Sequence, residues 1–216
     1  ISILKKRIKD FQYKRGSIIT VWNNKGGVGK TSVAQSLSIL LSRSKAFGRF
    51  DKNNILLIDY DHNQGDLTAN CGLPFGDGIT QELLEKDIKD ELTEQFDYEQ
   101  YLSVFTNKNR RPRSKFEFEI KVLRADSKLS KLGDKYLQYF SSKSKFPLRE
   151  LCLKLSKIFD YIIIDSPPNY EQSIFSRESI MASDCILPIA LYANKNSLIN
   201  FSKFDKNEIK DAQIDR

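Results

Sequence analysis

Short apolar runs alternate along this chain with longer segments in which apolar residues recur at helical spacing. The apolar runs are Ser17–Trp22, Asn54–Asp61, Tyr161–Ile164 and Cys185–Ala190. A continuous apolar run suits a parallel strand that is covered on both faces. We therefore expect these four segments to be strands of a mainly parallel sheet. Phe116–Leu123 alternates apolar and polar residues instead, which predicts a strand with one buried face.

The longer segments predict helices that alternate with these strands. Helical spacing is found at Thr31–Ser44, Ile79–Phe105, Ser127–Phe140, Pro147–Ile158, Gln172–Ala182 and Lys195–Phe204, after a basic amphipathic lead-in over residues 1–16. This order predicts an α/β fold with a mainly parallel, doubly wound sheet flanked by helices. We expect a single domain over residues 1–216, with its core at about 17–80 and 147–204 and an insertion at about 85–145.

A glycine-rich loop separates the first strand from the first helix, and its chemistry is that of a phosphate-binding loop. Glycines let successive backbone N–H groups turn toward an anion at a helix N-terminus. Lys30 would meet the β/γ-phosphates, and the Thr31 hydroxyl would bind Mg²⁺. Strand, loop and helix in this order predict a P-loop NTPase. The predicted nucleotide-binding residues are Gly26, Gly27, Val28, Gly29, Lys30, Thr31 and Ser32.

A second lysine in this loop indicates one family among the P-loop NTPases. Lys25 precedes the glycines, so the segment from Lys25 to Thr31 resembles the deviant Walker A box of the ParA/MinD family of ATPases, and is closest to the ParA-type partition ATPases. The resemblance implies that Lys25 reaches across a dimer interface to the phosphates of the ATP in the other subunit. A cation supplied in this way stabilises charge on the transferring phosphoryl group, as an arginine finger does.

Two further segments resemble other boxes of this family. Asp59 and Asp61 end the second apolar run as in the Walker A′ box, where the resemblance implies that Asp61 orients the attacking water and Asp59 supports the Mg²⁺ shell. Asp165 lies in the third box, which resembles Walker B, and the resemblance implies that it holds Mg²⁺ through water. The chain departs from the family at His62–Gly65, which is one residue longer than the usual Pro-Gln-Gly. This leaves open which polar side chain lies nearest the γ-phosphate.

Composition and charge add a class of partner. With 40% hydrophobic and 29% charged residues, the chain is typical of a soluble globular protein, and it contains no apolar run of the length of a membrane span and no signal peptide before the first strand. Its three widely spaced cysteines, Cys71, Cys152 and Cys185, fit a reducing cytoplasm. The net charge is +7. Clustered basic residues attract phosphates without regard to sequence, and the DNA-binding candidates are Arg110, Arg111 and Arg113.

The resemblance implies a functional cycle. ATP and Mg²⁺ would assemble a sandwich homodimer, which would bind non-specific DNA. A ParB-like protein or another cargo adaptor would then stimulate slow hydrolysis, so that a plasmid, chromosome or protein body is positioned. We expect a cytoplasmic protein that associates with the nucleoid in its ATP-bound state. The chain ends abruptly compared with the family, which predicts an incomplete C-terminus.

Two alternatives remain open at this point. A MinD-like membrane switch needs an amphipathic C-terminal helix. Residues 205–216 are too acidic and too poor in large apolar residues for that, although Ile1–Phe11 could serve instead. A metabolic enzyme of the same superfamily is the other alternative. Lys25 argues against most ligases, and the absence of a Cys-x-x-Cys motif argues against an iron–sulfur carrier.

Overall fold

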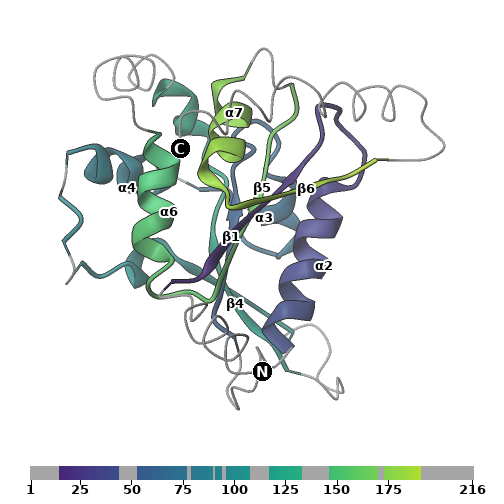
Figure 1. Ribbon diagram of the computed structural model, residues 1–216, viewed down its shortest axis with the longest axis horizontal. Coiled ribbons are helices and arrows are strands. Elements are labelled where there is room, and N and C mark those ends of the chain that lie inside the picture. The colour runs from purple at the N-terminus through teal and green to yellow at the C-terminus, as the bar shows by residue number, and fades with distance from the viewer. Residues whose placement is uncertain are drawn as a thin grey trace, which may run out of the picture.

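The protein folds around one six-stranded sheet (Figure 1). The computed structural model describes residues 15–43, 53–76, 79–89, 91–93, 96–107, 117–132, 146–169 and 173–190. The strand order is β3-β4-β2-β5-β1-β6, and every pair is parallel except β3 with β4. The strands are β1 (Ser17–Trp22), β2 (Ile55–Asp59), β3 (Ser103–Thr106), β4 (Glu119–Leu123), β5 (Tyr161–Asp165) and β6 (Cys185–Pro188). The predicted α/β fold with a mainly parallel, doubly wound sheet is confirmed.

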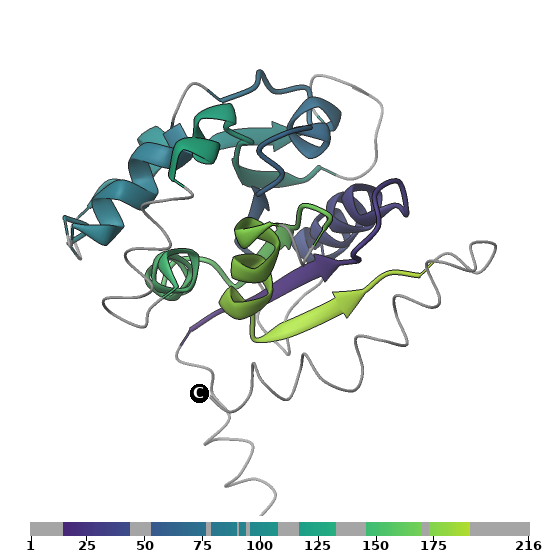
Figure 2. The same cartoon turned by 90° about the horizontal axis from the view of Figure 1, so that it is seen from above.

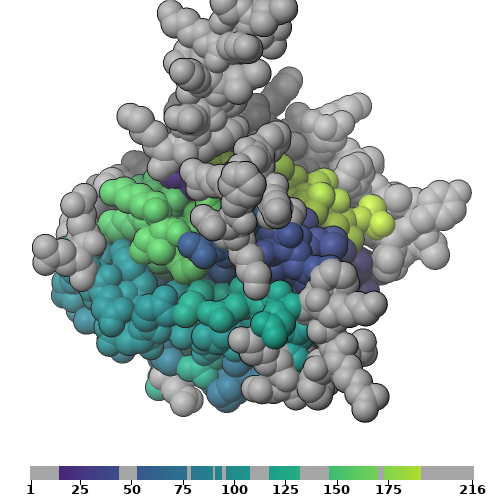
Figure 3. Space-filling model, turned by 90° about the horizontal axis from the view of Figure 1, so that it is seen from below, coloured from purple at the N-terminus to yellow at the C-terminus, as the bar shows by residue number. Residues whose placement is uncertain are grey.

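Helices cover both faces of the sheet (Figure 2). The α-helices are α2 (Lys30–Arg43), α3 (Asp66–Asn70), α4 (Ile79–Ile88), α6 (Pro147–Leu155) and α7 (Ile174–Ala182), with 3₁₀ helices η1 (Glu99–Tyr101) and η2 (Ser127–Leu132). The α2 and α3 helices lie on one face, whereas α4, α6 and α7 lie on the other. Seen from below, the surfaces of α2, α6 and the segment that includes β4 adjoin one another (Figure 3).

The central strand β2 shows why its first four residues, Ile55–Ile58, are apolar. All five of its residues are buried. Ile55 and Leu57 belong to the hydrophobic cluster on the α2 side, while Leu56 and Ile58 belong to the cluster on the α6 and α7 side. Successive strand residues point to opposite faces, so the part of a strand that is covered on both faces is apolar at successive positions, and in β2 the polar residue Asp59 follows only at the end.

The prediction of one helix over Ile79–Phe105 is confirmed only for its first ten residues, which form α4, and is wrong for the rest. The α4 helix ends at Ile88, and η1 and β3 follow before residue 106. The aromatic residues that suggested helical spacing pack on one another instead: the Phe96 ring lies 5.0 Å from Tyr98 and 5.6 Å from Tyr101, between centroids. Tertiary packing and pairing of β3 with β4 therefore override the local helical pattern.

Other predicted elements differ from the structure in type, or lie partly or wholly outside the described residues. The segment predicted to be helical over Ser127–Phe140 begins with the 3₁₀ helix η2, and its residues 133–140 lie outside the described residues. The helix predicted at Lys195–Phe204 and the lead-in over 1–16 also lie outside them, except for Arg15 and Gly16. The segment expected to be an insertion, about 85–145, supplies β3 and β4, which are both strands of the sheet. The extent of the domain and its insertion stays a prediction.

Candidate nucleotide-binding site

The candidate site lies where the parallel strands β1, β2 and β5 end. Val21 of β1 is paired with Asp165 of β5, and Asp165 is paired in turn with Asp59 of β2. The register therefore brings the predicted Walker A′ and Walker B carboxylates beside the strand that leads into the glycine loop. Ligands bind at this edge in open α/β sheets.

The glycine loop connects β1 directly to the N-terminus of α2, as predicted. Gly27 and Gly29 have φ angles of 69° and 92°, in the left-handed region that side chains with a Cβ disfavour. A Cβ built on either residue would meet no heavy atom within 4 Å. These glycines are therefore needed for the backbone conformation, and the loop faces open space at a helix N-terminus, which is suited to an anion.

Buried polar contacts hold this loop in place. Asn23 is 1% exposed, and its Oδ1 accepts a hydrogen bond from the Lys25 N–H at 2.7 Å. Its Nδ2 donates to the Ile189 carbonyl beyond β6. The Asn24 carbonyl accepts from the Asn169 N–H at 3.1 Å, which links the loop to the segment after β5. The loop is thus preorganised by contacts with both strands that flank β1.

Lys30 is a buried cation at the base of the loop. Its side chain is largely buried, and Nζ donates to the Lys25 carbonyl at 3.1 Å. Burial lowers its pKa, while the negative charges of Asp165 and Asp61 act in the opposite direction. A lysine facing two carboxylates at the start of a helix can bind the β/γ-phosphates of a nucleotide beside a metal ion that those carboxylates hold.

Asp165 and Thr31 have the donor chemistry of a magnesium site. Asp165 is 2% exposed, and its Oδ1 has no hydrogen-bond partner among the described residues. Burial raises its pKa to about 7, whereas a hydrogen bond from the Thr31 side chain lowers it. Leaving a buried polar atom unpaired costs about 1–3 kcal/mol, more when it is charged. The unpaired oxygen and the Thr31 hydroxyl therefore fit Mg²⁺, which takes one or two carboxylates together with phosphates.

Both carboxylate oxygens of Asp59 accept hydrogen bonds from neighbouring residues. Its Oδ2 accepts hydrogen bonds from both the N–H and the Oγ1 of Thr68, each at 2.7 Å, and its Oδ1 accepts from the Asp61 N–H at 3.3 Å. Burial raises its pKa to about 6, and these bonds act against that shift. Thr68 Oγ1 also accepts from the Ala125 N–H at 2.8 Å. Asp59 thus ties β2 to α3 and to the end of β4, a contact that the sequence did not reveal.

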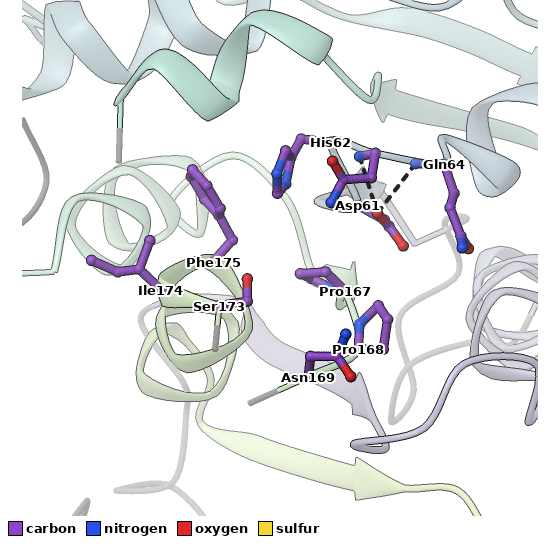
Figure 4. Close-up of a pocket in the computed structure, with 10 residues that line it drawn as sticks. Asp61, His62, Gln64, Pro167, Pro168, Asn169, Ser173, Ile174 and Phe175 are labelled. Atoms are coloured by element: carbon purple, nitrogen blue, oxygen red, sulfur yellow. Dashed lines mark hydrogen bonds between the residues drawn. The ribbon is translucent and has the colours of Figure 1, made fainter. Parts of the chain in front are cut away.

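Asp61 faces a cavity of about 390 Å³ beside the glycine loop (Figure 4). Asp61 is 8% exposed, and its Oδ1 accepts hydrogen bonds from the N–H groups of Asn63 at 3.1 Å and Gln64 at 3.3 Å. On the other side, the cavity is lined by Pro167, Pro168 and Asn169, and by the first residues of α7. Asp61 is therefore the predicted site residue that joins the phosphate loop to this cavity.

The cavity wall contains His62, whose role the sequence left undecided. Its ring lies 4.5 Å from the Phe175 ring, between centroids, at an interplanar angle of 52°. Burial lowers the pKa of His62, although the Asp61 charge raises it. Figure 4 shows the two rings facing each other on the side of the cavity away from Gln64.

Some predicted residues are not placed. Arg110, Arg111 and Arg113 lie outside the described residues, as does Ile1–Phe11. No helix in the described parts of the chain has both the length and the apolar character needed to cross a bilayer. Within the same parts, no group of three or more His, Cys, Asp or Glu side chains is arranged to hold a metal ion by itself.

The comparisons with known proteins agree on one family. Residues 16–212 match the family AAA_31, described as an AAA domain. The chain is 26% identical over 172 residues to the sporulation initiation inhibitor protein Soj of Bacillus subtilis, covering 80% of this chain and 57% of that protein. It is 27% identical over 172 residues to the chromosome partitioning protein ParA of Myxococcus xanthus, covering 80% and 51%. The chain thus spans just over half the length of these relatives.

A solved structure supports the same assignment. McdA of Cyanothece, in complex with ATP, is 26% identical and superposes with a TM-score of 0.64, covering 91% of this chain and 65% of that one. The chain therefore belongs to the AAA_31 family of AAA domains, and its sequence and fold are those of the ParA/MinD type of P-loop ATPase.

Proposed function

We propose that this protein is a ParA-like ATPase that hydrolyses ATP with Mg²⁺, dimerises around ATP, binds non-specific DNA and positions a cargo with the help of a stimulating partner. The observation that carries the proposal is the group formed by Lys30, Asp61 and Asp165. A buried lysine faces two carboxylates at the mouth of a glycine loop, and one carboxylate oxygen is unpaired among the described residues. This arrangement has the charges that Mg²⁺–ATP requires.

Each residue of the group has a separate task in the proposed reaction. The loop N–H groups and Lys30 bind the phosphates, while Thr31 and Asp165 would hold Mg²⁺. The metal ion, when bound, neutralises charge that develops on the phosphate oxygens. Asp61 orients the attacking water, because its carboxylate opens to the cavity while its two loop hydrogen bonds hold it in place. Asp59 supports this arrangement indirectly, because it accepts two hydrogen bonds from Thr68 and so holds β2 against α3.

Lys25 is proposed to complete the site of a second subunit. Its backbone is fixed on both sides, since its N–H donates to Asn23 and its carbonyl accepts from Lys30. Its side chain is partly exposed at the loop. A lysine that contacts the ATP of the other subunit would make dimerisation depend on the γ-phosphate, and hydrolysis would then release the dimer.

DNA binding and cargo positioning are supported by charge and by similarity. The net charge of +7 favours attraction to phosphates, and the similar M. xanthus protein is named for chromosome partitioning. Joining two basic surfaces in one dimer strengthens DNA binding through effective concentration. Arg110, Arg111 and Arg113 remain the proposed DNA contacts, and a ParB-like or cargo adaptor protein remains the proposed partner.

The test is binding of a non-specific DNA duplex with ATP–Mg²⁺ and with ADP–Mg²⁺ at two salt concentrations, together with phosphate release. We expect binding with ATP only, weakening steeply as salt rises. The Lys30→Ala variant is the matched control and should bind DNA equally weakly with either nucleotide. Phosphate release without ATP-dependent DNA binding would refute the DNA part of the proposal. Absence of phosphate release, with or without DNA, would refute the ATPase itself.

A further inference from the structure

The two residues on either side of Asp61 are both anchored to the same helix. Tyr60 is fully buried, and its hydroxyl donates to Glu178 Oε2 at 2.7 Å. Its ring meets the Phe175 ring edge-on, with centroids 5.7 Å apart at an interplanar angle of 75°. His62, the residue after Asp61, packs against the same Phe175 ring. We call Tyr60, His62, Phe175 and Glu178 the α7 clamp.

The helix that provides these anchors is itself held firmly. Thr20 of β1 donates through Oγ1 to the Ser179 carbonyl at 2.6 Å, which fixes α7 on the sheet. Glu178 is 2% exposed and also accepts a hydrogen bond from the backbone of Leu148 in α6. Because Phe175 and Glu178 are one turn apart, they present one face of α7 to the loop that carries Asp61.

From these contacts we infer that Phe175 and Glu178 of α7 are positioning residues, which hold the Asp61 carboxylate in its working geometry through Tyr60 and His62. The inference rests on the proposed ATPase function for its effect on rate. A carboxylate that orients water must be held within about 0.5 Å of the productive position. Fixing the residues before and after Asp61 adds to the restraint from its two carboxylate hydrogen bonds and from its own N–H, which donates to Asp59 Oδ1.

The clamp also links the two loops that line the cavity. Asp61–Gln64 forms one wall, and Pro167–Asn169 leads toward α7 on the other. Tyr60 adds a direct link, since its N–H donates to the Asp165 carbonyl at 3.1 Å. A displacement of α7 would therefore be transmitted to Asp61 through Phe175 and to Asp165 through Tyr60.

Two kinds of measurement test the inference. Tyr60→Phe removes only the hydroxyl, and Phe175→Leu removes the ring that both neighbours contact. We expect kcat for ATP to fall about 10-fold in each, with KM within about twofold, because misplacing a reacting group by 1 Å can cost about 100-fold. In the nucleotide-free protein, hydrogen exchange of the Asn63 and Gln64 amides should be about fivefold faster or more, because these amides donate to Asp61.

Two control variants separate positioning from a general loss of structure. Tyr101→Phe also removes a buried tyrosine hydroxyl that donates to a glutamate, here Glu82 Oε1 at 2.9 Å, but it lies between η1 and α4 rather than at α7. It should leave both kcat and the exchange of Asn63 and Gln64 within about twofold. Glu178→Gln is the conservative variant, since its amide can still donate to the Tyr60 oxygen, and kcat should be retained within about threefold.

The outcomes distinguish the clamp from the proposed function. An unchanged kcat and unchanged amide exchange in Tyr60→Phe and Phe175→Leu would overturn the clamp. An equal loss in Tyr101→Phe would overturn it as well, because the effect would then be general. A wild-type protein that does not hydrolyse ATP would refute the proposed function alone, and the amide exchange would still decide whether α7 holds Asp61.

Discussion

Glu178 is an acid buried in the helix face that packs on the sheet, and its ionisation should make the stability of this protein depend on pH. Burial raises its pKa from 4.5 to about 7, although hydrogen bonds from the Tyr60 hydroxyl and from the backbone of Leu148 act in the opposite direction. In the unfolded chain the carboxyl group is hydrated and releases its proton near 4.5. The folded state therefore binds the proton more tightly than the unfolded state does.

The sign of the effect follows from the proton count. Between pH 4.5 and about 7 the folded state binds more protons at Glu178, so the free energy of unfolding falls as pH rises. The contribution is fully present below pH 4.5 and is lost once the pH passes about 7. Each pKa unit corresponds to about 1.4 kcal/mol, so the loss amounts to about 3 kcal/mol.

The assay compares wild type with Glu178→Gln, which cannot ionise at this position. Urea unfolding at about pH 5 and about pH 8 gives the free energy of unfolding of each protein. From about pH 5 to about pH 8, the free energy of unfolding of the variant should rise by about 2–3 kcal/mol relative to that of wild type, because only wild type loses the contribution of Glu178. Asp59 and Asp165 also have raised pKa values, but both proteins contain them, so their contributions cancel in the difference. A difference that stays constant within about 0.5 kcal/mol would refute the reasoning.

Three further outcomes are expected. Lys30→Ala should weaken ATP binding at least 100-fold in a fluorescent-nucleotide titration, because it removes the buried cation of the phosphate loop; an unchanged Kd would contradict the assignment of the loop. Lys25→Ala should keep ATP binding but lose the ATP-dependent dimer mass in light scattering, and a persistent dimer would disprove a cross-subunit role. Gly27→Ala should lose about 1–2 kcal/mol of stability in urea unfolding, because it forces a residue with a Cβ into the left-handed region at φ 69°. Gly26→Ala is the control, since its Cβ would meet equally open space without a positive φ, and it should lose little stability. Equal losses in the two variants would show that the φ angle is not the cause.

The parts of the fold that could be predicted are those for which a local sequence pattern indicates a single structure. Ile55–Ile58 of β2 and Ile162–Ile164 of β5 are apolar because both faces of these strands are covered, and the glycine loop has its own backbone requirements at Gly27 and Gly29. β3 could not be predicted, because Val104 is 42% exposed and the strand exists through its pairing with β4. Its short pattern gives little sign of burial on one face.

The candidate site divides in the same way. The sequence named Lys30, Asp61 and Asp165, and the register of the strands brings them together. It did not name Thr68 or Glu178, because their partners lie 9 and 118 residues away and become neighbours only through packing. One signal was present for Glu178: apart from its neighbour Arg177, it is the charged residue in a helix of apolar and small residues, Ile174–Ala182, where a buried charge needs a partner.

The complete burial of β2 has a consequence for how mutational tolerance is distributed along this part of the chain. Polar substitutions within Ile55–Ile58 should reduce the amount of folded protein, because each of these side chains lies in one of the two hydrophobic clusters. Substitutions at Asp61, Asn63 and Gln64 should instead reduce turnover while abundance is kept, because these residues line the cavity. A scan that scores abundance and activity separately would thus find a sharp border at Tyr60, where selection for folding gives way to selection for chemistry.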